Sequence, residues 1–388
     1  MLQDFLNAKP LYYDEIDYTR MPRIYESIKS YLPTPKIIHL VGTNGKGTTG
    51  RFLATALHSL GFNTGHYTSP HIVEFNERVW INGKDADNET LEVAHIELQT
   101  ILSQDDSDAL SYFEYTTLLS LLIYKGCDYV VMEAGLGGEY DATAVFEKVL
   151  TLVTPIAYDH EAFLGNTIES IATTKLNAIQ KFAILGTQKE TEVYDIAKAM
   201  AQKNSINIQR VSHFLDRDDE QKMIKIAKKL KLESYLVQNL SLSISALKFL
   251  NIEYSDNNFT DARLFGRLTS INDNIIVDVG HNPLAAEAIR EALRHEKYVL
   301  VYNSYKDKDY KKILEILKPI VNSVEIIAIN DKRAETEDRL KRTLNDLEIK
   351  YSTFKSITPN IKYLVFGSFS VVEAFIKRHN KSGILEYE

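Results

Sequence analysis

The sequence predicts an α/β protein with two domains, because short β-branched runs alternate with helical patterns along most of the chain. The predicted strands are 37–41, 129–132, 149–153, 275–279, 298–301, 324–329 and 363–366. Such alternation is typical of mostly parallel sheets whose strands are joined by helices. The polar segment 254–258 has turn composition and separates a predicted helix ending near Leu250 from the later strands. We therefore predict domains at 1–257 and 258–388.

Composition narrows the class of protein. The chain has 388 residues, of which 44% are hydrophobic and 25% charged, so it can bury two separate cores. The formal net charge of −8 provides no general cationic field, and we expect no nucleic-acid partner. The single cysteine, Cys127, excludes an internal disulfide, fits a reducing compartment, and precedes an apolar run that predicts its burial.

The chain has no signature of a membrane protein. Its first residues lack a basic segment followed by an apolar one, and the longest apolar stretch, 118–123, is too short to span a bilayer. We therefore expect a soluble, cytoplasmic protein with no membrane partner. No long apolar or heptad pattern indicates an obligate partner chain, which favours a monomer.

The glycine-rich segment 42–49 follows the first predicted strand and opens a helical pattern that runs towards Leu60. Glycines let backbone N–H groups turn towards phosphate oxygens, a lysine can neutralise phosphate charge, and a threonine hydroxyl can hold Mg²⁺. A turn without a ligand would explain the glycines but not the lysine and hydroxyls at these positions. Leu40 stands where the strict pattern has glycine, so the loop is a shortened variant. The predicted nucleotide-binding residues are Thr43, Asn44, Gly45, Lys46, Gly47, Thr48 and Thr49.

Polar residues at other strand ends are candidate metal ligands. Glu133 ends a predicted strand and precedes a glycine-rich loop, His160 follows the next strand, and Ser69 follows the short run 65–67. Each of them alone is more typical of a turn or a structural position. Together, oxygen ligands and one imidazole suit Mg²⁺ that carries substrate phosphates, since open α/β sheets bind ligands at the carboxyl ends of strands.

The second domain has its own candidate residues at 278–283. Asn282 is a candidate N-cap and Pro283 the first residue of a helix, which leaves Asp278 and His281 at the carboxyl end of the preceding strand. Two chemically capable groups at this edge suggest that the second domain closes over the nucleotide. The charged segment 216–233 predicts only a solvated face.

These motifs together resemble the folylpolyglutamate synthase and dihydrofolate synthase branch of the Mur ligase superfamily. The resemblance extends from about Asp17 to Phe375. Its motifs stand in the family's order at 41–49, 67–71, 112–116, 133–143, 159–160, 266–267, 278–283, 307–309 and 367–369.

The resemblance implies an N-terminal P-loop-type ATPase domain and a smaller, Rossmann-like C-terminal domain. It also implies an ATP-dependent amide ligase, with Mg²⁺ at two sites. Such an enzyme passes the γ-phosphoryl group of ATP to an acceptor carboxylate, and the amino group of L-glutamate then attacks the acyl phosphate. The acceptors would be dihydropteroate and reduced folates.

Matched positions imply roles for individual residues. Lys46, Thr48 and Thr49 would serve the phosphates, Ser69, Glu133 and His160 would bind Mg²⁺, and Arg267 and Asp278 would contact ATP. Lys175 matches a lysine that carries a carbamate and binds a second Mg²⁺, although by itself it would be interpreted as a surface lysine. His281 would lie near glutamate or the transferred phosphate. The implied acceptor site consists of Arg23, Tyr112, Phe113, Glu114, Tyr115, Asp141 and Ala142.

The chain departs from the family pattern at several positions. Glu139 and Ala144 stand where the family usually has Arg and Asn, and Lys175 lies in Thr-Lys-Leu-Asn-Ala instead of Glu-Lys-Ala-Gly-Ile. Gln238 and Asn239 lie a few residues from the expected adenine contacts. Two alternatives to the bifunctional ligase follow: a ligase of the same architecture for another carboxylate, such as a cell-wall precursor, and a nucleotide-binding module without turnover. Retention of the lysine and the metal-ligand set argues against the module.

Overall fold

The chain folds into two compact units in the computed structural model, which describes residues 1–10 and 17–380. The N-terminal unit comprises Met1–Ala157 and Leu164–Arg263, and the C-terminal unit comprises Tyr158–Phe163 and the chain from Leu264 onward. The chain therefore passes to the second unit after Arg263, close to the predicted division after residue 257. The assignment of 158–163 to the second unit has no signal in the sequence.

The N-terminal unit contains an eight-stranded sheet in the order β4-β3-β2-β5-β1-β6-β7-β8 among the described residues. In this order, the neighbouring strands β2, β5, β1, β6, β7 and β8 all pair in parallel. β3 pairs antiparallel with β2, and β4 pairs antiparallel with β3. The strand bounds are β1 Lys36–Val41, β2 Thr64–Tyr67, β3 Val79–Ile81, β4 Lys84–Asp85, β5 Tyr129–Glu133, β6 Lys148–Val153, β7 Phe182–Leu185 and β8 Asn207–Arg210.

Helices connect these strands. The α-helices are α1 Leu2–Ala8, α2 Arg20–Ile28, α3 Lys46–Ser59, α4 Asn88–Ile101, α5 Gln104–Ala109, α6 Tyr112–Ile123, α8 Ile168–Leu176, α9 Glu192–Asn204, α10 Arg217–Leu230 and α11 Ser234–Phe249. The short helix α7, Glu161–Leu164, lies between β6 and β7 in the chain, and its first three residues belong to the C-terminal unit. Short 3₁₀ turns span Lys29–Tyr31, Phe75–Arg78, Ala142–Val145, Val211–His213 and Asp256–Phe259. No α-helix in the described ranges has the length and apolar character needed to cross a membrane.

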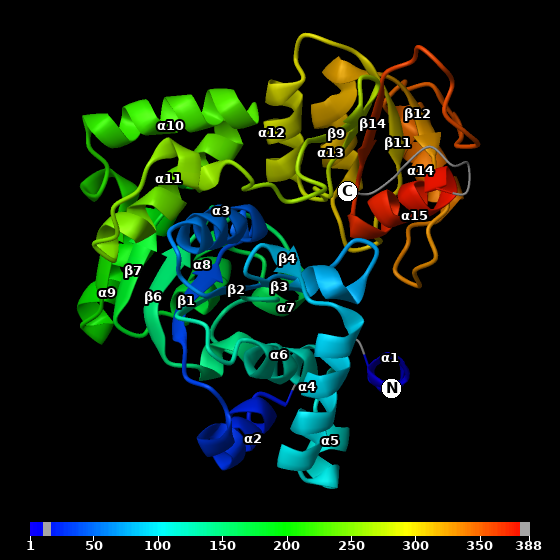
Figure 1. The fold of residues 1–388 in the computed structure, drawn as a ribbon. Coiled ribbons are helices and arrows are strands. Elements are labelled where there is room, and N and C mark those ends of the chain that lie inside the picture. The colour runs from blue at the N-terminus through cyan, green and yellow to red at the C-terminus, as the bar shows by residue number, and fades with distance from the viewer. Residues whose placement is uncertain (11–16, 381–388) are drawn as a thin grey trace. The chain divides into compact units, whose positions relative to one another are not determined.

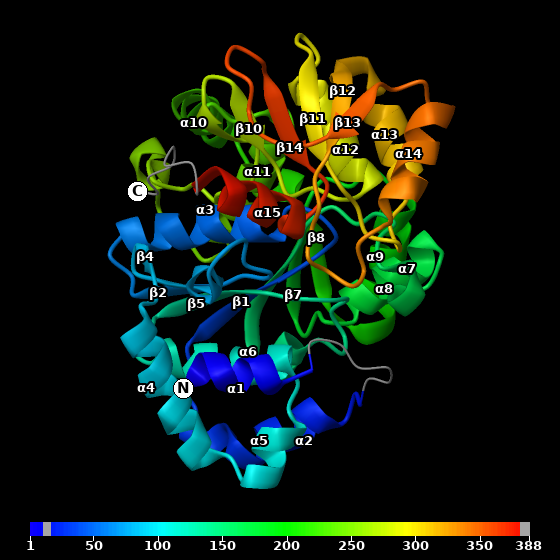
Figure 2. The same ribbon diagram turned by 90° about the vertical axis from the view of Figure 1, so that its right-hand side faces the viewer.

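The larger sheet is covered on both faces. Successive side chains of a strand point to opposite faces, so Val130 and Met132 of β5 pack with α1, α2, α4 and α6, whereas Tyr129 and Val131 pack with α3, α10 and α11. Figures 1 and 2 show α3 and α6 on opposite sides of this sheet. Burial on both faces explains the continuous apolar runs that predicted the central strands.

The C-terminal unit contains a six-stranded sheet in the order β13-β12-β11-β14-β10-β9 among the described residues, parallel except for β9. Its strands are β9 Thr269–Asn272, β10 Ile275–Val277, β11 Tyr298–Tyr302, β12 Val321–Ile326, β13 Tyr351–Thr353 and β14 Tyr363–Phe366. Its helices are α12 Pro283–Ala292, α13 Tyr310–Leu317, α14 Glu337–Asp346, α15 Phe369–Asn380 and the 3₁₀ turn Lys318–Ile320. The first three helices and the central strands enclose one apolar core.

Two predicted strands of this unit have different bounds in the structure. The run predicted at 275–279 stops at Val277, because the next residue, Asp278, turns into a loop that its own carboxylate holds. The run predicted at 324–329 begins earlier, at Val321, and ends at Ile326. Val321 pairs with Tyr298, so pairing extends this strand through polar residues that hid its start.

Candidate active site

The glycine-rich loop connects β1 to α3, as predicted. Gly42 and Gly45 have φ angles of 144° and 89°, which L side chains rarely adopt. A Cβ at Gly42 would lie 2.0 Å from Thr154 Oγ1, and one at Gly45 would lie 2.4 Å from Asn239 Oδ1. The loop therefore requires glycine at both positions, for conformation and for space.

The segment after β6 accepts hydrogen bonds from the glycine-rich loop. The backbone N–H of Thr43 donates to Pro155 O at 2.9 Å, and the Thr43 hydroxyl donates to Ala157 O at 3.1 Å. The N–H of Asn44 also donates to Pro155 O, at 3.3 Å. These bonds fix the loop, and the first-turn N–H groups of the following helix, which have no intrahelical acceptors, make its N-terminus suitable for an anion.

Lys46 is the first residue of α3. Its Nζ lies 3.3 Å from the carbonyl oxygens of both Gly42 and Thr43 and 3.7 Å from Glu133 Oε1. The hydroxyls of Thr48 and Thr49, one turn along, are buried and have no hydrogen-bond partner in the described part of the chain. A buried hydroxyl without a partner is costly, so a ligand that supplies one fits here.

Two of the predicted Mg²⁺ ligands come together at the end of β5. Glu133 Oε2 accepts hydrogen bonds from the Thr68 hydroxyl and from the backbone N–H of Ser69, the latter at 3.3 Å. A carboxylate and hydroxyls beside Lys46 form the oxygen-rich environment that a divalent cation with phosphates prefers. The residues present therefore fit Mg²⁺.

Lys175 lies in the interior, so its interpretation as a surface lysine was wrong. Its side chain on α8 is 4% exposed, and its Nζ donates to Gly42 O at 3.0 Å. The alternation of polar residues along α8 hid this burial. Gly138 packs directly on this helix, since a Cβ there would lie 2.8 Å from Lys175 O. The lysine thus connects the loop after β5 with the glycine-rich loop after β1.

Asp141 holds the loop that follows Glu133. Its Oδ2 accepts the N–H groups of Gly135 and Leu136, both at 2.9 Å, and its Oδ1 accepts the Thr143 hydroxyl at 2.5 Å. Burial raises the pKa of this carboxyl despite these hydrogen bonds. Ala142, the next residue, begins a 3₁₀ turn.

The other predicted acceptor residues divide into two groups. Phe113 lies at the loop after β5, where a Cβ on Gly135 would meet its ring at 2.7 Å, and Tyr112 lies beneath the guanidinium of Arg78 at 5.3 Å. Tyr115, in contrast, is fully buried, and its hydroxyl contacts His95 Nδ1 at 2.7 Å. Tyr115 therefore belongs to the core beneath this surface.

Glu114 and Arg23 both have ionic partners in the structure. Glu114 Oε2 accepts the N–H of Ser111 at 2.7 Å and lies 2.9 Å from Arg20 Nη2, with both ionic side chains 11% exposed. Arg23 forms an ion pair with Asp106 at 2.9 Å and is largely exposed. Arg20 is thus the more buried cation of α2, although sequence matching indicated Arg23.

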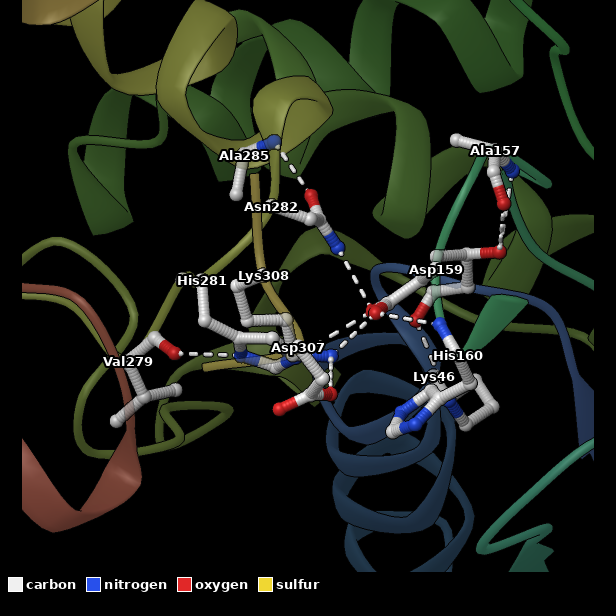
Figure 3. A network of polar contacts seen from close by, with 12 residues as sticks. Lys46, Ala157, Asp159, His160, Val279, His281, Asn282, Ala285, Asp307 and Lys308 are labelled. Carbon is white, nitrogen blue, oxygen red and sulfur yellow. Dashed lines mark hydrogen bonds and ion pairs between the residues drawn. The ribbon is translucent and has the colours of Figure 1, made fainter. Parts of the chain in front are cut away.

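In the C-terminal unit, polar side chains converge on Asp159 (Figure 3). Lys308 Nζ lies 2.5 Å from its Oδ1, Asn282 Nδ2 donates to its Oδ2 at 3.1 Å, and His281 Nε2 lies 3.4 Å away. Burial opposes ionisation of Asp159, but the hydrogen bond and charge of His281, with the charges of His160 and Lys308, hold its pKa well below the ordinary value. Asp159, His160 and His281 each offer one ligand atom, and these atoms lie within 4.8 Å of one another.

Arg267 lies just before β9, and Asp278 directly follows β10. Asp278 accepts the N–H of Leu268 at 2.8 Å and that of Gly280 at 2.7 Å, so its carboxylate joins two loops. Arg267 lies over the ring of Phe369 at 5.2 Å. Asn282 caps α12 by accepting the N–H of Ala285, and Pro283 is the first residue of that helix, as predicted.

Several residues at these sites had no role predicted from the sequence. Thr68 contacts Glu133, and Asn239 lies against Gly45, from the middle of α11 rather than before a helix. Asp159 and Lys308 were matched as family motifs but received no role. A buried polar residue inside an apolar helical pattern, as at Asn239, is the one signal that could have indicated such a contact.

Comparison with known proteins places the chain among named relatives, although no protein-family model matches it. It is 30% identical to the dihydrofolate synthase/folylpolyglutamate synthase of Escherichia coli over 334 residues, covering 81% of this chain and 78% of that protein. It is 29% identical to the Haemophilus influenzae protein of the same name over 413 residues, covering 93% of each.

Solved structures agree with this placement. The folylpolyglutamate synthetase of Helicobacter pylori matches with a TM-score of 0.81 and 38% identity over 98% of both chains. The Escherichia coli FolC protein in complex with DHPP and ADP matches with a TM-score of 0.82 and 25% identity, covering 98% of this chain and 97% of that chain. The α/β fold agrees with these similarities, and the chain belongs to the dihydrofolate synthase/folylpolyglutamate synthase family.

Proposed function

We propose that this chain is an ADP-forming ligase that joins L-glutamate to dihydropteroate and to reduced folates. The strongest support is the arrangement around Lys46: a loop that requires glycine at two positions, a lysine beside Glu133, and two buried threonine hydroxyls without a hydrogen-bond partner among the described residues. This arrangement fits the phosphates of ATP. The relatives named above include one solved with ADP, which supports the same nucleotide here.

The reaction begins with transfer of the γ-phosphoryl group to the acceptor carboxylate. Lys46 would move from the carbonyls of Gly42 and Thr43 to the phosphate oxygens, where its charge stabilises the negative charge of the transition state. The loop N–H groups would orient the phosphates. The resulting acyl phosphate has a good leaving group, so the amine of glutamate can displace phosphate and form the amide.

Ser69, Glu133 and the hydroxyl of Thr48 would hold Mg²⁺ in the N-terminal unit. When bound, the ion neutralises phosphate charge and favours in-line transfer. We also propose His160 as a Mg²⁺ ligand, and Lys175, if carbamylated, as the ligand of a second ion. The buried ammonium of Lys175 now donates to Gly42 O, and a carbamate would replace that donor by an anion.

The remaining assignments rest on the resemblance to the family. We propose that Asp278 and Arg267 contact ATP, that His281 lies near glutamate or the transferred phosphate, and that the acceptor lies by Arg23, Tyr112, Phe113, Glu114, Asp141 and Ala142. Tyr115 would support this surface from the core. We further propose a cytoplasmic monomer of 44.2 kDa, which sedimentation can test.

The function is tested by glutamate-dependent phosphate release from MgATP, with dihydropteroate and tetrahydrofolate supplied separately and the products weighed by mass spectrometry. Release with both, each acceptor gaining one glutamyl mass, is the expected result. Release with one acceptor would restrict the proposal to that reaction. Silence with both acceptors, while ADP still binds, would contradict it and favour another carboxylate.

Lys46→Ala should lower phosphate release by at least about 100-fold, because the transition state loses a charge placed for it. Its melting temperature should stay near that of the wild type, since the ammonium caps only loop carbonyls and one carboxylate. Lys181→Ala, at an exposed ion pair, is the matched control and should keep full activity. Wild-type turnover by Lys46→Ala would remove the basis of the phosphate-loop assignment.

A further inference from the structure

Asp159 is a buried carboxylate of the C-terminal unit with several polar partners, and no step of the proposed reaction uses it. It is 9% exposed, and its Oδ1 also accepts its neighbour's backbone N–H, from His160, at 2.9 Å. Figure 3 shows Lys308, Asn282 and His281 converging on it from separate parts of the chain. A buried charge with this many partners holds each of them in a defined position.

The partners of Asp159 lie on three segments. Asp159 belongs to the short segment 158–163, Asn282 is the N-cap of α12, and Lys308 lies between β11 and α13. The carboxyl ends of parallel strands are where open α/β sheets place ligand-binding residues. One carboxylate thus joins the segment carrying His160 to the loops that follow two strands of the C-terminal sheet.

Asp159 forms the shorter of the two ion pairs of the buried Lys308 side chain. The Lys308 side chain is 6% exposed, and its other ion pair, with the half-exposed Asp307, is longer at 3.7 Å. Removal of one partner from a buried pair leaves a charge without compensation, which is far more costly than removal of both. Asp159 therefore determines where the Lys308 ammonium lies.

The same carboxylate restrains the imidazole of His281. Its Nδ1 lies 3.2 Å from Val279 O, and its Nε2 lies 3.4 Å from Asp159 Oδ2. A polar contact at each ring nitrogen restricts both rotation and ring flipping. Asn282, the next residue, donates to the same Oδ2 while its own oxygen accepts the Ala285 N–H, so the start of α12 and the histidine are oriented together.

We propose that Asp159 is a positioning residue of the ligase: it orients His281 and Lys308 and anchors the His160 segment to the C-terminal unit. This inference rests on the proposed function, because it assigns a role in that reaction. The competing interpretation is a divalent-cation site formed by Asp159, His160 and His281. The ammonium of Lys308 and the amide of Asn282 already occupy the Asp159 oxygens, which disfavours a cation there.

The test compares Asp159→Asn, Lys308→Met and the double variant in the full chain. Asp159→Asn keeps the shape but removes the charge, so kcat should fall by about 100-fold, as expected when a reacting group is misplaced. The affinity for ADP should stay within about twofold. The melting temperature of Asp159→Asn should be lower than that of the wild type, because the Lys308 ammonium loses its carboxylate. The melting temperature of the double variant should recover, because neither charge remains.

The double variant should therefore differ from the wild type in activity but not in stability. In the double variant we expect a recovered melting temperature together with the low kcat of Asp159→Asn. The ring ¹⁵N resonances of His281, assigned by comparison with His281→Gln, should be shifted in both variants that lack Asp159. Glu296→Gln combined with Lys362→Met is the control, since that pair of the same unit also spans 2.5 Å but is exposed, and all three readouts should match the wild type.

Three results would overturn the proposal. Full activity in the double variant would show that the pair only stabilises the fold, and unchanged His281 resonances would show that Asp159 does not orient the ring. A loss in Asp159→Asn that high Mg²⁺ or Mn²⁺ restores would favour the cation site. If the wild type itself releases no phosphate, the proposed function has failed, but the His281 resonances still report on the orientation by Asp159.

Discussion

At the scale of single residues, two glycines share a conformation but differ in surroundings. Gly45, in the glycine-rich loop after β1, has φ 89° and lies against Asn239, whereas Gly61 has φ 93° and no described atom lies within 4 Å of a Cβ placed there. Both positions disfavour an L side chain for the same backbone reason. Only Gly45 adds a steric demand, which makes the two a matched pair for experiment.

Gly61→Ala should therefore lower the free energy of unfolding by about 1 kcal/mol and leave ADP binding unchanged. Gly45→Ala should cost more than this, because Asn239 must also move, and should weaken ADP binding by at least about tenfold. Urea denaturation and titration calorimetry measure the two quantities. Equal ADP affinities in the two variants would mean that the Gly45 conformation is not needed for the nucleotide.

At the scale of elements, the N-terminus of α6 supports both folding and the proposed acceptor surface. Ser111 caps the helix by accepting the N–H of Glu114 at 3.1 Å, and Glu114 returns a bond to the N–H of Ser111, which forms a capping box. Glu114 also forms the buried ion pair with Arg20 of α2. The helix start is thereby joined to a second helix by one carboxylate.

Ser111→Ala should lower the free energy of unfolding by about 1 kcal/mol, as for other N-caps. Glu114→Ala should cost about 2–3 kcal/mol, because it removes its half of the box and leaves the guanidinium of Arg20 without its carboxylate. Ser103→Ala, which removes the cap of the neighbouring α5, controls for loss of a cap alone. Similar costs for Ser111→Ala and Glu114→Ala would show that the ion pair contributes nothing measurable.

At the scale of the whole molecule, two buried histidines make stability depend on pH. His39 on β1 and His66 on β2 are 0% exposed, and neither ring nitrogen of His66 has a partner among the described residues. Burial, with the positive charges of Lys148 and Arg51 respectively, lowers both pKa values well below the ordinary value. The folded chain therefore keeps both rings neutral where the unfolded chain would protonate them.

The stability from these neutral rings is present above pH about 6.5, the unfolded pKa, and is lost as pH falls below it. Each histidine should add a slope of about 1.4 kcal/mol per pH unit in that acidic range. Urea denaturation between pH 4.5 and 7, with each pH about half a unit apart, measures the slope. His66→Leu should remove one such increment. A slope unchanged in His66→Leu would contradict this assignment.

The strand–loop–helix around Lys46 was predictable because its information is local. A buried run, glycines with φ angles that other residues avoid, and a lysine at the helix start specify the motif without reference to the rest of the chain. The central strands were predictable for the same reason, since burial on both faces produces continuous apolar runs. The edge strands β4, β8 and β9 were not, because their residues are largely polar and only pairing with a neighbour makes them strands.

The sequence by itself determined the fold class, the glycine-rich loop between β1 and α3, and the family, because the order of the motifs and the apolar periodicity can be recognised along the chain. Only the tertiary structure decided which side chains meet across long separations. It buried Lys175 against Gly42, brought Asn239 to Gly45 and joined Asp159 to Lys308. These contacts depend on how sheets and helices pack, and no local pattern in the sequence indicates which distant residues will meet.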